Sequence, residues 1–157
     1  MFESIDRIAI AVKDLDKAIG FFSDLLDIDF FIFPLQEGMG MRGAYSASGL
    51  ELIAPTGPDT MLAKFIEKRG EGLWSLILKV KNMDEAIKKF EEKGLKQKGD
   101  VTFGKMREVG FHPKGTFGVH ITLAEYPAEH PATWAALDRR SSAGWMGCRC
   151  CWRWRVR

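Results

Sequence analysis

The 157-residue sequence lacks any run of about 18 consecutive apolar residues, so no segment is expected to cross a membrane as a helix. It also lacks an apolar leader core, because charged, strand-like sequence begins within the first six residues, which argues against secretion. We therefore expect a cytoplasmic protein without a membrane partner. With 46% hydrophobic residues, the chain can bury a core as one domain or as two half-domains that share one.

Cysteine is absent before Cys148, and all three cysteines lie in residues 139–157, which read RRSSAGWMGCRCCWRWRVR. This segment holds six of the 23 basic residues and no acidic residue, so residues 1–138 carry a formal charge of −4. An Arg and Trp segment can bind nucleic acid or an anionic membrane, and cysteines can hold a metal. The cysteine spacing does not suit a zinc pair and a fourth ligand is missing, so we expect a disordered extension without a nucleic-acid partner.

One strand and helix pattern occurs twice in the sequence. Segment 8–12 alternates between more and less apolar residues, as in a strand with two different faces, and Asp14 then caps an amphipathic helix. The pattern restarts in segment 76–80, where Asn82 is the cap. At an offset of 68 residues, six positions are identical, namely Val12 and Val80, Lys13 and Lys81, Asp16 and Asp84, Ala18 and Ala86, Ile19 and Ile87, and Phe22 and Phe90.

Further elements complete two copies of a β-α-β-β-β module, residues 4–55 and residues 72–126. A short helix over residues 60–69, capped by Asp59 or Thr60 and stopped by Gly70, joins the modules. The remaining strands are expected at residues 30–33, 44–46 and 50–54 in the first copy, and at 106–111 and 119–124 in the second. We predict a single α+β domain within residues 1–138, built from the two paired modules.

If each module covers one face of its sheet with its own helix, the opposite faces can together enclose a cup. Alternation places Arg7 on the cup face of the first strand and Ser75 at the matching position of the second module. Glu51 matches Thr122 when GLELIA is aligned with VHITLA, and His120 shares the face of Thr122. These five side chains are therefore the candidate site.

These features resemble the vicinal oxygen chelate superfamily, which includes glyoxalases, bleomycin-resistance proteins and dioxygenases. The resemblance rests on the doubled module and on the segments IAVKDLDKAIGFF, ELIAPTGPDTMLAKFIEKRGEGL and FHPKGTFGVHITLAE. EKRGEGL and the FHPKG turn are typical of the branch that contains methylmalonyl-CoA epimerase and glyoxalase I. The resemblance implies a cup-shaped sheet with helices outside, a homodimer, and a divalent metal held by one residue from each of the four matched positions.

The sequence departs from that family pattern at three of the four positions. Epimerase-like members have two histidines and a glutamate where this chain has Arg7, Ser75 and Thr122, and Glu51 alone keeps a ligand-type side chain. A guanidinium has no acceptor atom, and hydroxyl groups are weak ligands for a transition metal. We therefore expect no metal cofactor, although His120 could join Glu51 and rebuild a divalent-metal site.

Arg7 places a fixed positive charge beside Glu51, where the family's cation would lie. The pair could hold a carboxylate, enolate or thioester oxygen of a ligand, with Glu51 orienting Arg7 or acting as a base. His120, as the cup-facing imidazole, is the candidate proton carrier near neutral pH. Equally, Arg7 and Glu51 could be a satisfied salt bridge in a vacated metal site, and His120 a packed structural residue.

Three further residues are candidates for ligand contact. Glu37 lies in the glycine-rich loop EGMGMRG, which the resemblance places over the cup. Phe31 and Phe111 come from strands whose alternation sends about half of the aromatic side chains toward the cavity. His112, in the FHPKG turn, is expected to make a structural hydrogen bond instead.

Three classes of function follow from this reasoning. The first is a metal-independent isomerase, epimerase or lyase that transfers a proton on a small acyl or carbonyl compound, with Arg7, Glu51 and His120 in its site. The second is a protein that binds a small molecule without turnover, as antibiotic-resistance members of the superfamily do. The third is a structural protein whose cup is filled. We expect the first.

Overall fold

The computed structural model describes residues 1–33 and 39–127. The first module contains β1 (Phe2–Ala11), α1 (Leu15–Leu26), β2 (Phe31–Ile32), β3 (Met41–Tyr45) and β4 (Leu50–Pro55). Helix α2 (Met61–Arg69) leads to the second module. That module contains β5 (Gly72–Val80), α3 (Met83–Glu92), β6 (Gln97–Phe103), β7 (Met106–Phe111), the 3₁₀ turn η1 (Pro113–Gly115) and β8 (Ile121–Glu125).

The α-helices begin at the polar residues that the sequence indicates. The Asp14 side chain accepts a hydrogen bond at 3.0 Å from a backbone N–H three residues later, and Asn82 does the same at 2.9 Å in the second module. Thr60 rather than Asp59 caps α2, since its hydroxyl accepts such a bond at 3.1 Å. Each cap satisfies a backbone donor that the helix leaves unpaired.

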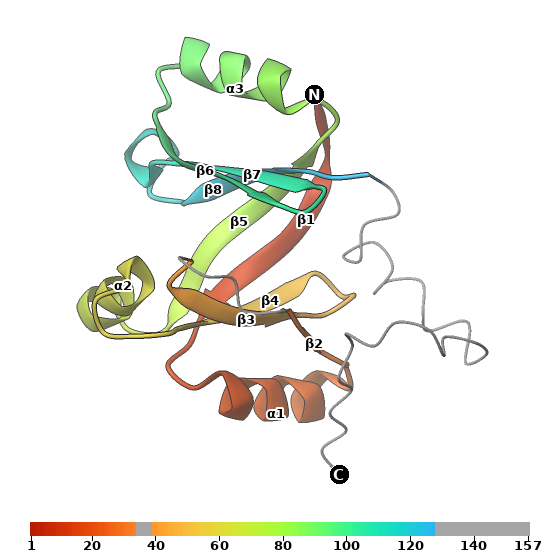
Figure 1. Ribbon diagram of the computed structural model, residues 1–157, viewed down its shortest axis with the longest axis vertical. Coiled ribbons are helices and arrows are strands. Elements are labelled where there is room, and N and C mark those ends of the chain that lie inside the picture. The colour runs from red at the N-terminus through yellow and green to blue at the C-terminus, as the bar shows by residue number, and fades with distance from the viewer. Residues whose placement is uncertain (34–38, 128–157) are drawn as a thin grey trace, which may run out of the picture.

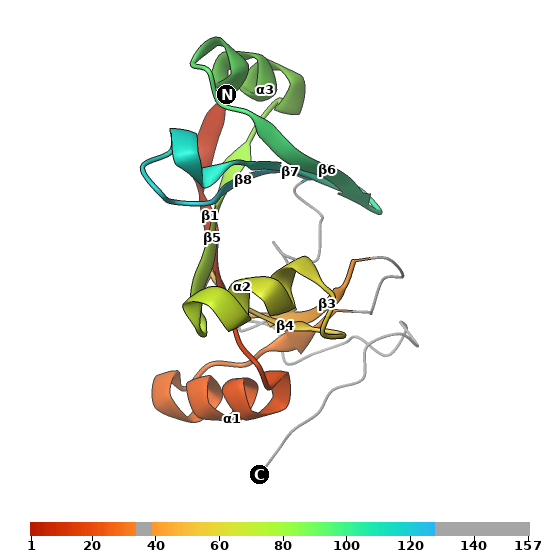
Figure 2. The same ribbon diagram turned by 90° about the vertical axis from the view of Figure 1, so that its left-hand side faces the viewer.

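The eight strands form one sheet in the order β2-β3-β4-β1-β5-β8-β7-β6, so the two modules join along β1 and β5. β1 is parallel to β4, β5 is parallel to β8, and β1 and β5 are antiparallel, as expected for a pseudo-twofold pair. Figure 1 shows β2-β3-β4 and β6-β7-β8 as two wings on either side of β1 and β5, and Figure 2 shows that the sheet curls into a C. We name the concave side between the wings the trough.

Three buried clusters fill the spaces on the two sides of this sheet. Helices α1 and α3 cover the outer faces of the first and second wings, each over its own apolar cluster. The third cluster lines the trough, where two residues of α2 join five strand residues that alternation places on the cup face. These residues are Leu62 and Ile66, and Ala9, Ala11, Ile53, Ile77 and Ala124. Helix α2 therefore closes one end of the trough.

The sheet differs from the sequence-based expectation in its outer parts. Strand β6, which reads QKGDVTF, was not predicted, because it is polar and shows no apolar alternation. Strand β2 is shorter than expected, and Phe31 on it is 44% exposed, while Phe33 packs against the trough cluster instead. On the convex side, Ile8 is 42% exposed because each helix covers only its own wing. Within the described ranges, no helix combines the length and apolar composition needed to cross a bilayer.

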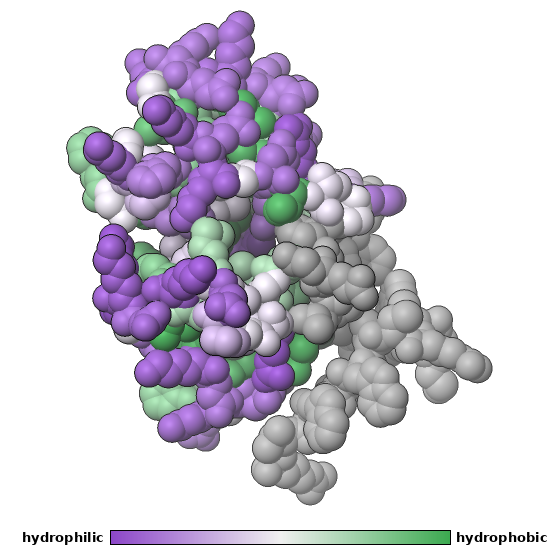
Figure 3. Space-filling view, turned by 60° about the vertical axis from the view of Figure 1, so that its left-hand side comes forward, coloured by the Kyte–Doolittle hydropathy of each residue, from purple (hydrophilic) through white to green (hydrophobic). Residues whose placement is uncertain are grey.

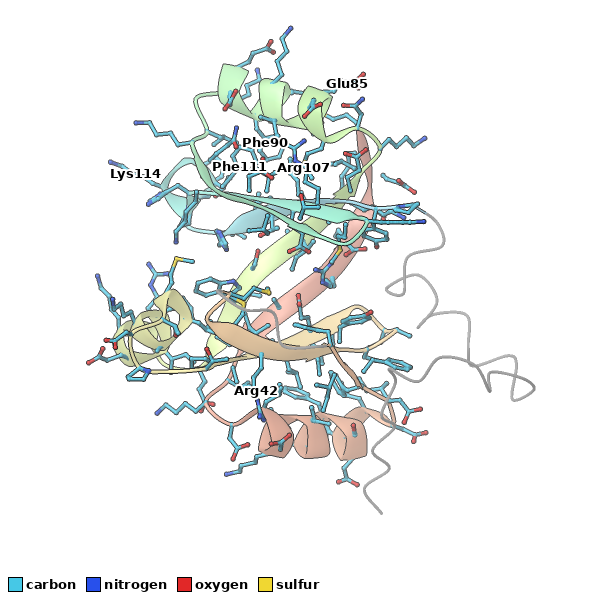
Figure 4. All side chains as sticks on the ribbon, in the orientation of Figure 1. Arg42, Glu85, Phe90, Arg107, Phe111 and Lys114 are labelled. Atoms are coloured by element: carbon cyan, nitrogen blue, oxygen red, sulfur yellow. The ribbon has the colours of Figure 1, made fainter. Side chains whose placement is uncertain are left out.

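Phe111 lies on the opposite face of the sheet from the one predicted. It is fully buried beneath α3, and its ring centroid is 4.7 Å from that of Phe90. Figure 4 labels both residues between α3 and the second wing. Alternation along β7 sends Glu108 and Gly110 toward the trough, so Phe111 faces the helix. The prediction that Phe111 contacts a ligand in the trough is therefore wrong.

The substitution Phe111→Ala is expected to lower the free energy of unfolding by about 3–5 kcal/mol, because it removes a fully buried ring and leaves a cavity. Phe21→Ala is the control, since Phe21 is 60% exposed on α1 and its loss should cost less than about 1 kcal/mol. Urea unfolding followed by circular dichroism measures both. Equal losses in the two variants would contradict the placement of Phe111 in the core.

Candidate functional site

Arg7 lies buried on the trough face of β1, surrounded by three carboxylates. Its Nε donates a hydrogen bond to Glu51 Oε2 at 2.9 Å, its Nη1 donates to Asp6, and its Nη2 donates to Glu108. The four side chains are between 8% and 16% exposed. We name Asp6, Arg7, Glu51 and Glu108 the arginine centre.

The arginine centre takes residues from both modules. Glu51 lies on β4, the direct neighbour of β1, whereas Glu108 lies on β7 in the second wing, 101 residues from Arg7. Asp6 takes part because the pairing of β1 with β5 shifts by one residue between Ile5 and Arg7. At such a β-bulge, two adjacent side chains can turn to the same face. The centre thus links the two wings across the trough.

The carboxylates determine the charge state of the arginine centre. Burial disfavours a charged guanidinium, but Glu51, Glu108 and Asp6 outweigh burial and raise the pKa of Arg7, which stays a cation. Burial raises the pKa of the Glu108 carboxyl; Arg7 opposes this shift, and the charges of Glu51 and Asp6 add to it. The Tyr126 hydroxyl donates a hydrogen bond to Asp6. The centre therefore combines a fixed cation with one carboxyl group suited to hold a proton.

Ser75 and Thr122, at the other two matched positions, bond to each other. Their hydroxyl oxygens are 2.9 Å apart on the neighbouring strands β5 and β8, and Ser75 Oγ also lies 3.1 Å from the backbone carbonyl of His120. When Ser75 donates its single proton to that carbonyl, Thr122 is the donor to Ser75. The four matched positions thus form two internally satisfied pairs, one charged and one neutral.

The four positions do not fit the divalent metal that the superfamily implies. The guanidinium of Arg7 has no lone pair for a metal, and it already binds Glu51. Asp6 and Glu108 converge on the same guanidinium, which carries the positive charge that an ion would supply. Among residues 1–33 and 39–127, no group of three or more His, Cys, Asp or Glu side chains has the geometry to hold an ion.

His120 is not part of the arginine centre. Its ring lies edge-on to Trp74, with centroids 5.4 Å apart, and its Nε2 lies against the backbone of Gly110 on β7. Within the described ranges, Glu51 is paired with Arg7, and His120 and Glu51 belong to no group of three or more side chains that could hold an ion.

His120 lines a pocket of about 220 Å³ at the end of the trough that α2 closes. Burial lowers the pKa of His120 to about 4; Lys98 and His112 add to this shift, and the backbone of Trp74 opposes it. A pKa so far below 7 makes His120 a poor proton carrier near neutral pH, contrary to the sequence-based expectation. Within the described residues, its Nδ1 is buried and has no hydrogen-bond partner.

The structure tests the expectation for His112 but not those for Glu37 and the segment 139–157. His112 makes the expected structural hydrogen bond, because its Nδ1 accepts from the backbone N–H of Lys114 at 3.1 Å at the start of η1. Glu37 lies outside the described residues, and so does the segment 139–157 with its cysteines and arginines. The roles suggested for them stay predictions.

Sequence reasoning missed three residues of the trough, Asp6, Trp74 and Glu108. Glu108 shares a strand face with Met106 and Gly110 in MREVGF, so the alternation applied to the other strands would have found it. Asp6 and Trp74 both lie where the pairing of β1 with β5 shifts. Strict alternation fails at such shifts, and the sequence carries no signal for them.

Comparisons with known proteins agree with this fold. Residues 6–111 match the family model of the Glyoxalase/Bleomycin resistance protein/Dioxygenase superfamily. The mitochondrial methylmalonyl-CoA epimerase of Mus musculus is 28% identical over 130 residues, which make up 77% of this chain and 72% of that protein.

Solved structures of methylmalonyl-CoA epimerases are also similar to this chain. A variant of the Streptomyces coelicolor methylmalonyl-CoA epimerase, in complex with 2-nitronate-propionyl-CoA, matches with a TM-score of 0.73 and 26% identity over 82% of this chain and 100% of that chain. The Mycobacterium tuberculosis epimerase matches with a TM-score of 0.73 and 28% identity over 80% and 89% of the two chains. The chain belongs to the Glyoxalase/Bleomycin resistance protein/Dioxygenase superfamily. It is related there to epimerases, which are isomerases.

The substitution Arg7→Met is expected to cost about 3–5 kcal/mol of stability at pH 7.5, because it leaves buried carboxylates without their cation. The deficit should shrink toward pH 5, since the folded variant then takes up protons on these carboxylates at a higher pH than the unfolded chain. Urea unfolding at both pH values measures this. Arg42→Met is the control, because Arg42 and Asp16 form an exposed ion pair, worth about 1 kcal/mol or less. Equal losses at Arg7 and Arg42 would contradict the account.

His120 is expected to stay neutral from pH 8 to pH 5 and to titrate near its pKa of about 4. The unfolded chain binds this proton near pH 6.5, whereas the folded chain binds it only near pH 4. The contribution of His120 therefore lowers the free energy of unfolding as the pH falls from about 6.5 toward 4. Imidazole resonances followed by NMR against pH measure the titration, and the His120→Asn variant identifies the signal. A midpoint above pH 6 would show that the ring is not held in the buried setting described.

Proposed function

We propose that this protein is an isomerase-type enzyme that moves a proton at the carbon next to the carbonyl group of a small acyl compound, without a metal ion. The observation that supports this is the arginine centre, which gathers acidic side chains from both modules around one cation on the trough face. A similar enzyme was solved with 2-nitronate-propionyl-CoA, so acyl-CoA thioesters are the first substrate class to test.

Epimerisation needs two acid-base groups, because a proton leaves one face of the carbon and another arrives at the opposite face. Glu51 and Glu108 come from opposite wings and bond to different nitrogens of the Arg7 guanidinium. Their side chains are 12% and 16% exposed, so part of each remains accessible. This arrangement favours a base on one wing and an acid on the other.

The charge states suggest a role for each group. The ion-paired carboxylate of Glu51 removes the proton from the carbon, and the electron pair of the broken C–H bond delocalises onto the carbonyl oxygen as an enolate. Glu108, whose pKa burial raises, gives its proton to the other face and forms the new C–H bond. The two carboxyl groups have then exchanged protonation states, and the reverse reaction runs with the roles exchanged.

Arg7 has two roles in this proposal. Three of its five N–H groups hold the carboxylates in place, which makes it a positioning residue for Glu51 and Glu108. The other two N–H groups can face the enolate oxygen, where a fixed positive charge in a buried setting lowers the energy of the developing anion. In metal-dependent members of the superfamily a cation supplies this charge. Here the guanidinium supplies it.

The trough also contains apolar material for the body of the ligand. Phe33, Met41 and Met106 pack, partly buried, against the trough cluster and come from both wings. These side chains favour an acyl group with a short aliphatic chain, because a flexible methionine can adapt to different shapes. Ser75 and Thr122 add a neutral hydroxyl pair within the same cup face.

Ligand binding without turnover is the second candidate function. It is favoured by the closed set of ion pairs around Arg7, since a buried charge that is already paired needs no substrate to satisfy it. In that case the arginine centre is a structural replacement for a metal, and the protein sequesters a small molecule. The experiment below separates the two candidates.

The expected homodimer stays a prediction. Ile5, Ile8 and Leu73 are 63%, 42% and 57% exposed on β1 and β5, in the part of the sheet that α1 and α3 leave open. Exposed apolar residues that lie together often mark an interface, and a second copy of the chain could cover them. The cytoplasmic location and the small-molecule partner are proposals of the same kind.

Exchange of the substrate's α-hydrogen for solvent deuterium tests the enzyme hypothesis. Methylmalonyl-CoA and other acyl-CoA thioesters are incubated with the full chain in heavy water, and deuterium uptake is measured by mass spectrometry. Glu51→Gln is expected to lower the exchange rate by at least about a hundredfold, since it removes the base. Glu108→Gln is expected to lower the rate at which one epimer becomes the other by the same order, since it removes the acid for the opposite face. Glu92→Gln, an exposed change on α3, should leave both rates unchanged.

Three results would count against the proposal. Exchange that persists in the double variant Glu51→Gln, Glu108→Gln would show that other residues move the proton. Exchange that is lost with a chelator and restored by cobalt or zinc would show that a metal takes part. Binding of an acyl-CoA by wild type without any deuterium uptake would favour the second candidate function.

A further inference from the structure

The pocket beside His120 has a charge pattern that the arginine centre does not explain. It lies between α2, the start of β5 and the turn that precedes β8, and in Figure 3, which brings the α2 side forward, the surface is hollowed between the two wings. The lining residues that carry charge or an aromatic ring are Phe65, Arg69, Trp74, Lys98 and His120. The lining thus includes two cations and no acidic residue.

Arg69 and Lys98 approach aromatic rings of this pocket. The Arg69 guanidinium carbon is 5.9 Å from the ring centroid of Phe65, and Lys98 Nζ is 5.9 Å from that of Trp74. In the part of the chain that the structure describes, neither cation forms an ion pair with a carboxylate. Positive charge at the pocket is therefore uncompensated and available to an anion.

His120 also lines the pocket. Its Nδ1 is buried and has no hydrogen-bond partner among the described residues, so the ring contributes to the pocket as part of its wall. The rest of the lining is mainly apolar, with Trp74 and Phe65 as an edge-to-face pair 5.0 Å apart.

We infer that this pocket binds a small organic anion, with a carboxylate or phosphate group between Lys98 and Arg69 and an apolar body against Trp74. A volume of about 220 Å³ lies below the range of roughly 300–1,000 Å³ for drug-sized ligands, so the ligand is small. Arg7, Glu51 and Glu108 do not line the pocket, so the inference stands independently of the proposed reaction. Ser75 alone among the four matched positions contributes to it.

Isothermal titration calorimetry of the full chain with benzoate and phenyl phosphate tests this inference. Benzamide, a neutral analogue of benzoate, should bind at least about tenfold more weakly. A hydrogen bond to a charged group contributes more binding free energy than one to a neutral group, and the difference corresponds to about that factor in affinity. Inorganic phosphate should also bind more weakly, since it lacks the apolar body. Preference for benzoate or for phenyl phosphate shows which anion the pocket favours.

Matched variants locate the binding site. Lys98→Gln and Arg69→Gln are each expected to weaken benzoate binding by about tenfold. Lys96→Gln and Lys68→Gln remove neighbouring charges that do not line the pocket, and they should have no effect. All four variants retain the six arginines of residues 139–157, so weaker binding in Lys98→Gln and Arg69→Gln would show that those arginines are not the binding site.

The NMR signal of His120 provides a second readout. Its imidazole resonances should shift when benzoate is added to wild type, and the shift should be lost in the double variant Lys98→Gln, Arg69→Gln. Benzoate affinity that is unchanged in this double variant would overturn the inference, as would equal binding of benzamide. Glu51→Gln should leave benzoate binding intact while it lowers deuterium exchange, so the two proposals fail separately.

Discussion

The burial of Arg7 is the constraint on which the trough depends. A guanidinium cannot lose its charge at any pH a protein survives, so a buried arginine has to be paired. Three carboxylates perform this task, and one of them, Glu108, comes from the other module. Through Glu108, the arginine centre links the second wing to the first across the trough. The pKa of Glu108 is raised chiefly by its burial, and the nearby charges of Glu51 and Asp6 add to the shift.

A symmetric framework here supports an asymmetric site. The repeat places Arg7 opposite Ser75 and Glu51 opposite Thr122, and the strand pairing of β1 with β4 mirrors that of β5 with β8. Yet one pair is ionic and the other consists of two hydroxyl groups. His120 and the pocket lie beside the hydroxyl pair, since Ser75 bonds to the backbone carbonyl of His120 and lines the pocket. The symmetry of the two modules determines which positions face the trough, and the residues at those positions determine its chemistry.

Much of the fold could be predicted from the sequence, because amphipathic periods and helix caps are local signals. Asp14, Asn82 and Thr60 begin helices as indicated, and alternation correctly placed Arg7 beside Glu51. The site was less predictable, because the pairing shifts that bring Asp6 and Trp74 into the trough depend on how two distant strands meet. The environment of His120 likewise depends on burial by residues far apart in the chain, which periodicity does not report.

The position of β1 in the middle of the sheet has a consequence for synthesis on the ribosome. β1 pairs on one side with β4, within its own module, and on the other with β5, which begins at Gly72. One edge of β1 therefore stays unpaired until the chain has grown by about sixty further residues, and exposed strand edges invite association with other chains. The pairing of Arg7 is completed later still, because Glu108 is synthesised last among its three carboxylate partners. Until the second module is synthesised, the N-terminal module therefore has an open β1 edge and lacks Glu108 as a partner of Arg7.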